Sequence, residues 1–372
     1  MKSRARDLNI RIGQLQPGPL NAITDVPGVR VGHSNVRGRS DSGRDICTGV
    51  TVIEPRRGST NQQPCFAGVH VLNGNGDATG LEWIREAGLL TSPIAFTNTH
   101  SLGVVRDALI ALDRQQQPDD GRLYWNMPVV LETFDGLLND INGFHVKPEH
   151  VAEALHSAHD GAVEEGAVGG GSGMICHEFK GGIGSASRRL SSAQGGWTVG
   201  AIVQANHGIR SELRVDGYPV GRYMEQVDSP FLRASLPHPG MGSIVVCLAT
   251  DAPLLPHQCT RLAQRASLGL ARSGGGNEDH SGDIFIAFAT GNEQVPSAAY
   301  EGKGAPTCDG LRMVNNDHIS ELFLAATEAV EEAIINALLA SESTAGNGHA
   351  VPGLDKEILL AALAKAGWPG AR

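Results

Sequence analysis

The sequence predicts an α/β fold in which sheets pack together and helices lie on the outside. Short apolar, β-branched runs alternate with helical stretches along the chain, which favours mixed layers over an all-helical protein. The 48 glycines among 372 residues follow no fixed period, and no segment has the low complexity of a disordered linker. A domain usually needs about 150 residues, so the length predicts two domains or one large layered domain.

The individual elements follow from hydrophobic periodicity. The clearest helix is 317–340, where apolar residues recur every three or four positions and Asp317 is the expected N-cap. On its polar side we expect a solvent-facing row of Glu321, Glu328, Glu331 and Glu332. Strands are predicted at 66–72, 93–97, 127–132, 197–205, 244–249 and 284–289, and further helices at 81–90, 102–114, 149–156, 254–272 and 354–366.

Composition and motifs exclude several classes of function. A net charge of −10, with no Lys/Arg run longer than a doublet, argues against a nucleic-acid partner. The start of the chain lacks the apolar segment of a secretory signal, and no 18-residue apolar span occurs, so we expect a cytoplasmic protein without membrane contact. The six cysteines form no CxxC pair and the histidines no HExxH motif, so we expect neither disulfides nor a metal, and no cofactor.

The most informative segment is 239–249, in which a Pro/Gly-rich turn ends at Ser243 and a buried strand begins. A self-processing hydrolase would have its nucleophile at such a position. The Ser243 hydroxyl would attack the preceding carbonyl and break the Gly242–Ser243 bond. The freed α-amine, with a pKa of about 7.7–8.0, would then serve as a built-in base. A serine that merely begins a strand is the alternative, and the local pattern leaves it open.

Other strand ends carry groups that suit the same chemistry. Asn206 ends the strand at 197–205, where its amide could donate a hydrogen bond to an oxyanion. Ser281 and Asp283 are two residues apart before the strand at 284–289, so in an extended segment they point to the same side. Glu132 ends another strand, and its carboxylate could bind a substrate ammonium group. Each of these residues could instead be an ordinary polar strand terminus.

The segment 74–80 offers a competing hypothesis, a protein that binds nucleotides without catalysis. Its glycines follow a predicted strand and precede a predicted helix, as in a dinucleotide-binding loop. The spacing, however, is GxGxxxG instead of GxGxxG, and no acidic residue ends a second strand about 20 residues later. Tight turns explain these glycines better.

Taken together, the motifs resemble those of the L-aminopeptidase/D-esterase-amidases and β-peptidyl aminopeptidases, the DmpA-like family. The motifs that carry the resemblance extend over nearly the whole chain and follow one another in a single order. It rests on NAITDVPGV (21–29), VGH (31–33), NGNG (73–76), TNTHS (97–101), ETFDG (132–136), LNDI (138–141), VGGGSGM (168–174), FKGGIG (179–184), VQAN (203–206), GSI (242–244) and SGD (281–283).

The resemblance implies a single domain, 1–372, with the four-layer αββα sandwich of N-terminal-nucleophile hydrolases and the connectivity shared with ornithine acetyltransferase. It implies self-cleavage into an α chain (1–242) and a β chain (243–372), and homo-oligomers of these processed αβ units. The family is one of serine aminopeptidases that release N-terminal residues from short peptides, amides or esters through an acyl-enzyme. Acyl transfer to an amine, as in ornithine acetyltransferase, is the alternative.

The resemblance also implies roles for single residues. Ser243 matches the nucleophile and Asn206 the oxyanion-hole asparagine. Ser281 and Asp283 match the pair that assists the nucleophile, and Glu132 matches the carboxylate that receives the substrate amine. The chain departs from the family pattern at position 134, where Phe134 replaces a tyrosine and offers no hydrogen-bond donor. The sequence does not indicate whether L-, D- or β-amino acids are preferred.

Overall fold

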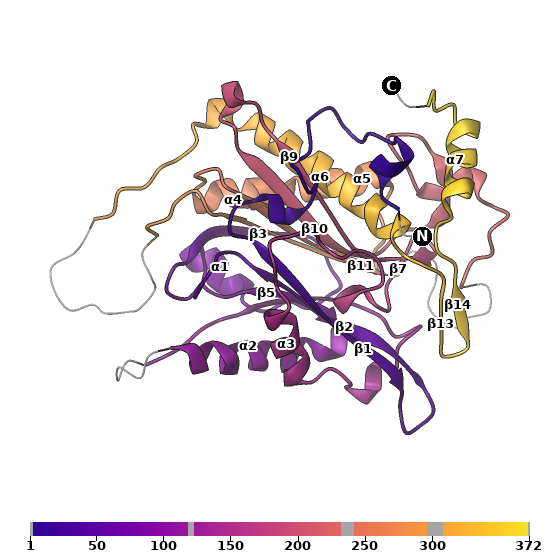
Figure 1. Ribbon diagram of the computed structural model, residues 1–372, viewed down its shortest axis with the longest axis horizontal. Coiled ribbons are helices and arrows are strands. Elements are labelled where there is room, and N and C mark those ends of the chain that lie inside the picture. The colour runs from indigo at the N-terminus through magenta and orange to yellow at the C-terminus, as the bar shows by residue number, and fades with distance from the viewer. Residues whose placement is uncertain (1–2, 118–122, 232–241, 296–307, 371–372) are drawn as a thin grey trace.

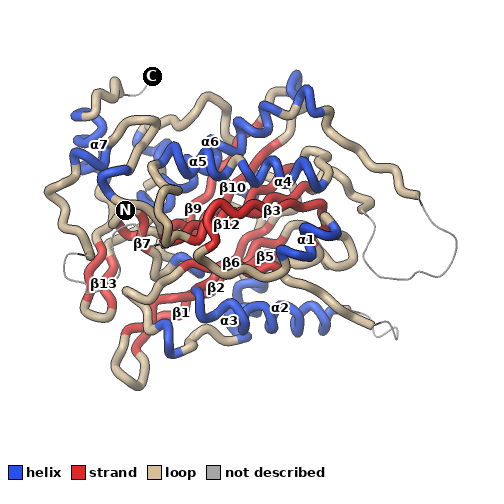
Figure 2. The backbone as a smooth tube through the Cα atoms, turned by 180° about the vertical axis from the view of Figure 1, so that it is seen from behind, coloured by secondary structure: helices blue, strands red, loops and turns tan. Residues whose placement is uncertain are grey.

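Two large sheets lie face to face in the middle of the molecule, and helices cover the outer face of each (Figures 1 and 2). The computed structural model describes residues 3–117, 123–231, 242–295 and 308–370. Helices α2 and α3 cover one sheet, and α4, α5 and α6 cover the other. The α/β fold with four αββα layers is therefore confirmed.

The elements have the following bounds. The strands are β1 (Arg30–Arg39), β2 (Asp45–Glu54), β3 (Cys65–Gly74), β4 (Leu89–Leu90), β5 (Ile94–Asn98), β6 (Val129–Thr133), β7 (Ile175–Cys176), β8 (Phe179–Lys180), β9 (Gly182–Arg189), β10 (Thr198–Asn206), β11 (Ser243–Thr250), β12 (Gly282–Ala289), β13 (Thr344–Gly346) and β14 (His349–Val351). The α-helices are α1 (Leu81–Ala87), α2 (Leu102–Gln116), α3 (Pro148–His156), α4 (Pro256–Gln264), α5 (Ala266–Ser273), α6 (Ser320–Leu339) and α7 (Lys356–Lys365).

The strand order brings distant parts of the chain together. The smaller sheet has the order β1-β2-β5-β6, and the larger has the order β4-β3-β12-β11-β10-β9. Strands β11 and β12 run parallel, whereas β10 and β3, their outer neighbours, are antiparallel to them. The starts of β11 and β12 therefore lie at the same edge as the end of β10.

Apolar side chains from both sheets fill the space between the layers. Ile53, Phe96 and Leu131 of the smaller sheet belong to one buried cluster with Val245 and Ile286 of the larger sheet. Every residue of β11 and β12 is buried. Strands covered on both faces need apolar residues at nearly every position, which explains why these two were evident as continuous apolar runs.

Several predicted boundaries were wrong. The helix expected at 254–272 is two helices, α4 and α5, which meet at Arg265. The helix expected at 81–90 ends at Ala87 because Gly88 adopts a left-handed conformation with φ +71°, and a short strand follows. Strands β1 and β2 were not predicted, since β1 mixes charged and glycine residues with few apolar ones. Within the predicted connection 216–242, residues 232–241 lie outside the described part of the chain.

The expected solvent face of α6 was also wrong. Glu328, Glu331 and Glu332 are at most 4 % exposed. The fully buried Arg188 of β9 forms ion pairs with Glu328 at 3.0 Å and with Glu332 at 2.7 Å, and Arg6 of the N-terminal segment pairs with Glu332 at 2.9 Å. A second layer of chain thus covers the acidic side of this helix.

The start of α6 differs from the prediction as well. Asp317 lies in a short 3₁₀ turn, Asn316–His318, that precedes the helix, and the side chain of Asn315 caps that turn. The helix itself begins at Ser320, with Ile319 as its N-cap residue.

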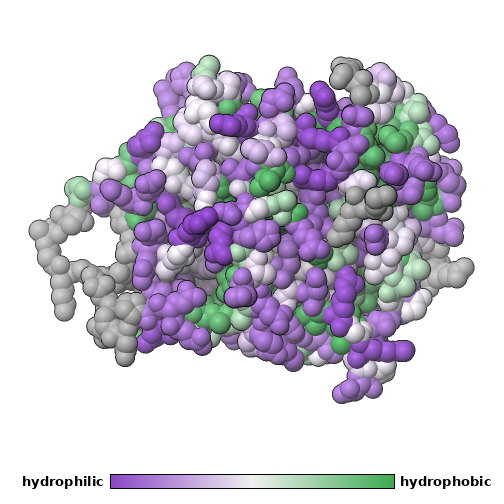
Figure 3. Space-filling view, in the orientation of Figure 1, coloured by the Kyte–Doolittle hydropathy of each residue, from purple (hydrophilic) through white to green (hydrophobic). Residues whose placement is uncertain are grey.

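The surface is mixed in character. On the face in Figure 3, apolar side chains form small groups separated by hydrophilic ones. In the described parts of the chain, no helix has the length and hydropathy needed to cross a bilayer. His156 and His159 are exposed, as expected for surface histidines.

Candidate active site

Ser243 is the first residue of β11 and lies at the edge where three strands of the larger sheet meet. Its register partner across the antiparallel ladder is Asn206, the last residue of β10. Its Oγ accepts a hydrogen bond of 3.0 Å from the backbone N–H of Gly282, the first residue of β12. The side chain is mostly buried, with 5 % of the residue exposed. The backbone of Ser243 is thus placed by β10, and its hydroxyl is held by β12.

Gly242 could not be replaced without moving the chain. A Cβ built at this position would overlap the backbone carbonyl oxygen of Asn206. The same Cβ would be 3.4 Å from the Asn206 side-chain nitrogen, so the peptide before Ser243 passes directly beside that amide.

Ser281 and Asp283 meet each other, as their spacing predicted. The Ser281 Oγ donates to Asp283 Oδ1 at 2.6 Å, and both residues are at most 1 % exposed. Asp283 Oδ1 also lies 3.3 Å from the backbone N of Ile244, which donates to it, and Asn73 donates to Oδ2 at 3.2 Å. Burial raises the pKa of Asp283, and these hydrogen bonds partly oppose the rise. The Asp283 carboxyl group therefore lies beside Ile244, the residue that follows Ser243.

The amide of Asn206 is oriented by its neighbours. Its Oδ1 accepts a hydrogen bond of 2.7 Å from the backbone N–H of Ile175, and its Nδ2 donates to the carbonyl oxygen of Phe134 at 3.0 Å. One of the two amide hydrogens is used in this way, which leaves the other for a further acceptor.

Glu132 reaches the same edge from the smaller sheet. It lies near the end of β6, is 3 % exposed, and accepts hydrogen bonds from the backbone N–H of Asp77 at 2.8 Å and from the Thr99 hydroxyl. Burial raises its pKa, against the effect of these two hydrogen bonds. It is therefore a buried group and not a solvated strand terminus.

Gly76 connects the two halves of the site. A Cβ built on it would be 3.2 Å from Glu132 Oε1 and 3.3 Å from the Cα of Gly282, the residue that donates to Ser243. The glycine-rich segment 74–80 therefore packs between the carboxylate and the serine. Its backbone binds Glu132, which accounts for a motif that resembled a dinucleotide loop.

Phe134 is the most exposed of the predicted residues, at 47 %. Its backbone carbonyl accepts the hydrogen bond from Asn206, and its ring covers Gly136. A tyrosine at this position could donate a hydrogen bond from its hydroxyl. The ring of Phe134 has no donor, so that bond cannot form.

The structure also shows partners that the sequence did not single out. Asn73 and Thr99 hold the two carboxyl groups, and the Gly282 N–H holds the serine. All three lie in motifs that carried the family resemblance, which was the available signal, but strand register was needed to assign their contacts.

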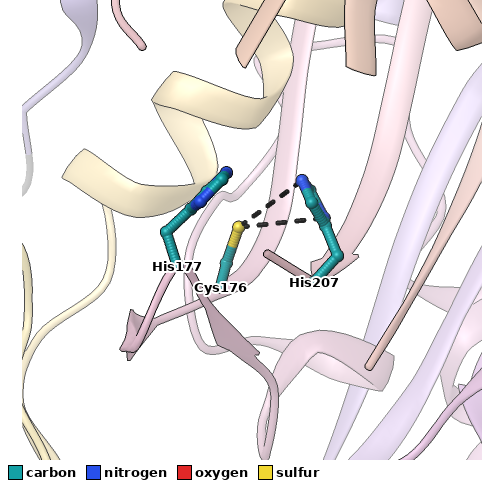
Figure 4. A group of neighbouring side chains, drawn as sticks. All are labelled: Cys176, His177 and His207. Atoms are coloured by element: carbon teal, nitrogen blue, oxygen red, sulfur yellow. Dashed lines mark hydrogen bonds between the residues drawn. The ribbon is translucent and has the colours of Figure 1, made fainter. Parts of the chain in front are cut away.

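A buried group behind Asn206 was also missed. Cys176, His177 and His207 point toward one another (Figure 4), and their ligand atoms lie within 4.8 Å of each other. His207 follows Asn206 in sequence, and its ring nitrogens lie 3.8 and 4.0 Å from the cysteine sulfur. Such donors suit a thiophilic ion such as Zn²⁺, but a closed structural zinc site needs four ligands, and in the described chain this group has three. Desolvation raises the pKa of the Cys176 thiol to about 12 and lowers that of His177 to about 4, which favours neutral side chains.

Comparisons with known proteins agree with this arrangement. The model of peptidase family S58 matches residues 21–351. The β-peptidyl aminopeptidase BapA of Sphingosinicella microcystinivorans is 44 % identical, covering 97 % of this chain and 92 % of that protein. BapA of Sphingosinicella xenopeptidilytica is 39 % identical, covering 98 % and 92 %.

Solved structures show the same fold. A β-aminopeptidase from Burkholderia sp. superposes with a TM-score of 0.93 at 65 % identity, covering 98 % of this chain and 99 % of the other. The L-aminopeptidase D-Ala-esterase/amidase of Ochrobactrum anthropi, described as a prototype serine aminopeptidase with a variant of the Ntn-hydrolase fold, superposes with a TM-score of 0.88 at 43 % identity, covering 98 % and 99 %. These relatives support hydrolysis and not the acyltransferase alternative. The chain belongs to peptidase family S58 and is an aminopeptidase with an Ntn-hydrolase fold.

Proposed function

We propose that the chain cleaves itself between Gly242 and Ser243 and that the new N-terminal serine is the nucleophile of the aminopeptidase. The observation that carries this proposal is the position of Ser243, which begins a buried strand with Asn206 opposite and the Gly282 N–H on its hydroxyl. In the first step Oγ attacks the Gly242 carbonyl carbon, the C–N bond breaks, and the serine nitrogen leaves with a proton. Water then hydrolyses the resulting ester and frees the carboxyl group of Gly242.

Substrate turnover would repeat this chemistry on an external acyl group. The α-amine of Ser243 takes the hydroxyl proton as Oγ attacks the substrate carbonyl, then gives it to the leaving amine. The second hydrogen of the Asn206 amide stabilises the oxyanion, a contribution of about 3 kcal/mol in comparable sites. Water resolves the acyl-enzyme, and the released amino acid leaves with a free carboxyl group.

Ser281 and Asp283 would hold the new α-amine. The carboxyl group already accepts from the N–H of Ile244, the neighbour of Ser243, and it accepts the Ser281 hydroxyl at 2.6 Å. A carboxylate next to an α-ammonium group stabilises its positive charge. The Ser281–Asp283 pair would therefore favour the protonated α-amine of Ser243 that forms after each attack.

Glu132 would bind the free amine of the substrate. Its oxygens accept from Asp77 and Thr99, and a carboxylate has lone pairs left for further donors. Because Gly76 packs against both Glu132 and Gly282, a substrate amine on Glu132 would place the first carbonyl near Ser243.

We propose that the preferred substrates are short peptides or amides that begin with a β-amino acid. The support comes from the names of relatives with high identity, the BapA proteins and the Burkholderia β-aminopeptidase. A panel of β-Ala, L-Ala and D-Ala para-nitroanilides tests this substrate class, and faster hydrolysis of either α-aminoacyl substrate would contradict it. A cytoplasmic location and oligomers of processed αβ units also stay predictions.

Mass spectrometry of the purified protein tests self-cleavage directly. We expect two chains that begin at the native N-terminus and at Ser243, and a single inactive full-length chain for Ser243→Ala. Ser229→Ala is the matched control, because Ser229 lies in the same connection and contacts only Phe231 in the described hydrogen bonds. A wild-type protein that stays intact while it hydrolyses aminoacyl amides would contradict the proposal.

A further inference from the structure

Lys180 has a buried amine whose position the proposed chemistry has not yet used. The residue ends β8 and is 0 % exposed. Its Nζ donates to the carbonyl oxygens of Gly171 at 3.2 Å, Met174 at 2.8 Å and Gly181 at 2.8 Å. Within the described residues no carboxylate forms an ion pair with it. Burial lowers the pKa of this amine to about 7, and three backbone carbonyls around one nitrogen hold the group in place.

One peptide group connects this lysine to Asn206. The carbonyl of Met174 accepts from Lys180 at 2.8 Å, and the N–H on the other side of the same peptide bond, that of Ile175, donates to Asn206 Oδ1 at 2.7 Å. Because a peptide group is planar and rigid, fixing the direction of its carbonyl also fixes the direction of its N–H.

That N–H decides which end of the Asn206 amide faces Ser243. With Oδ1 bound to Ile175, the Nδ2 group points to the Phe134 carbonyl and passes beside Gly242. Turning the Met174–Ile175 peptide would remove the donor from Oδ1 and free the amide to rotate, which would present an acceptor instead of a donor to the reacting carbonyl.

Other hydrogen bonds also hold the segment 169–174: the N–H of Gly169 donates to Asn35, that of Gly170 donates to Thr51, and those of Ser172 and Met174 donate to carbonyls within the segment. Four of its six residues are glycine, and the Ser172 hydroxyl is buried without a hydrogen-bond partner. A further N–H, from Gly181, also donates to the Met174 carbonyl at 2.9 Å. Lys180 binds the carbonyls of both Gly171 and Met174, two residues that a backbone hydrogen bond from the Met174 N–H to the Gly171 carbonyl also joins.

We propose that Lys180 is a positioning residue that acts through the Met174–Ile175 peptide to hold the Asn206 amide in its donating orientation. The inference rests on the proposed role of Asn206 as oxyanion donor. In its protonated state, the amine on the far side of the peptide also polarises the N–H of Ile175 and strengthens its bond to Oδ1. Lys180 itself does not touch the substrate.

A double-mutant cycle on the full-length protein tests this coupling. The variants are Lys180→Met, which keeps the aliphatic length and removes the donors, Asn206→Ala, and the two combined. Lys147→Met is the control, since Lys147 precedes α3 on the surface. The readouts are kcat and KM on an aminoacyl para-nitroanilide for the matured protein and, for every variant, the half-time of self-cleavage, which passes through the same kind of oxyanion.

Lys180→Met should lower kcat about tenfold or more and leave KM nearly unchanged, because the loss is confined to the transition state. The combined variant should be no slower than Asn206→Ala, since the lysine has nothing left to orient. If the fold-loss of kcat in the combined variant equals the product of the losses in the two single variants, the residues act independently and the inference is overturned. A wild-type kcat in Lys180→Met would also overturn it.

The remaining outcomes also separate the two proposals. If Asn206→Ala keeps wild-type activity, the proposed role of Asn206 fails, and this inference fails with it. If Asn206→Ala is impaired and Lys180→Met is not, the inference about Lys180 alone fails. Should Lys180→Met not fold, Lys180→Gln, which retains an NH₂ donor, replaces it in the cycle. Failure of both variants to fold would mark a purely structural lysine and overturn the positioning role.

Discussion

Replacing Gly242 by alanine is the sharpest test of how the chain before Ser243 is held. The added methyl group would need about 1.6 Å more room to reach an ordinary contact distance of 3.4 Å from the Asn206 carbonyl oxygen. That oxygen belongs to Asn206, the last residue of β10; the strand is paired with β11 at this residue and with β9 up to Ala205, so its backbone resists displacement. The Gly242–Ser243 peptide must move instead.

A displacement of about 1 Å in a reacting group costs roughly 10²-fold in rate, so we expect self-cleavage of Gly242→Ala to be at least that much slower. Pulse-labelled translation followed by electrophoresis gives the half-time of cleavage. Molecules that do mature should keep the wild-type kcat, because residue 242 is then a free chain end that can move away from β10.

Gly103→Ala is the matched control. A Cβ built on Gly103 in α2 meets nothing within 4 Å, so this variant should mature at the wild-type rate. If Gly242→Ala matures as fast as the wild type, the reasoning from the close approach to Asn206 is refuted.

Two further predictions follow from the site, and a third follows from Asp135, which is buried just after β6. Asn206→Ala should lower kcat on para-nitroanilides about 10²–10³-fold, and a loss expressed only in KM would contradict the oxyanion role. Glu132→Gln should raise KM at least tenfold for substrates with a free amine, as removal of a charged hydrogen bond of about 1.5–3 kcal/mol predicts; Glu82→Gln, on the exposed side of α1, is the control, and an unchanged KM would count against amine binding. Burial raises the pKa of Asp135 to about 7, so the folded state holds this proton longer than the unfolded chain and stability falls as pH rises from about 4 to 7. Asp135→Asn should therefore raise the Tm by several degrees at pH 8 and leave it nearly unchanged at pH 4. An equal Tm shift at both pH values in calorimetry would contradict the raised pKa of Asp135.

The sequence was most informative where local pattern and final environment coincide. Strands β11 and β12 are apolar throughout because both faces are covered, so both were predicted within a residue or two. For α6, periodicity located the apolar side but could not show that Arg188 and the N-terminal segment cover its glutamates. Whether a polar helix face meets water or a buried cation depends on chain segments far away in sequence.

In the candidate site, too, the sequence was informative where local pattern decides the environment and uninformative where distant segments do. Local pattern made Ser243 and the Ser281–Asp283 pair candidates at strand starts, and their roles came from the family resemblance; the hydrogen bond between Ser281 and Asp283 agrees with their spacing. The bond from Gly282 to Ser243 depends on the parallel register of β11 and β12, and the link from Glu132 depends on how the two sheets stack. Neither relation is present in any single segment. Lys180 was visible only as part of a glycine-rich motif.

The order of strands in the larger sheet has a consequence for a protein cut before β11. Strands β11 and β12 would come from the C-terminal fragment, while β3 on one side and β10 on the other would come from the N-terminal fragment. Separating the fragments would require breaking two full ladders at once and exposing the central cluster between the sheets. The nicked enzyme should therefore melt in one transition, in which unfolding and separation of the fragments occur together, so its Tm should fall on dilution, unlike that of an uninterrupted polypeptide.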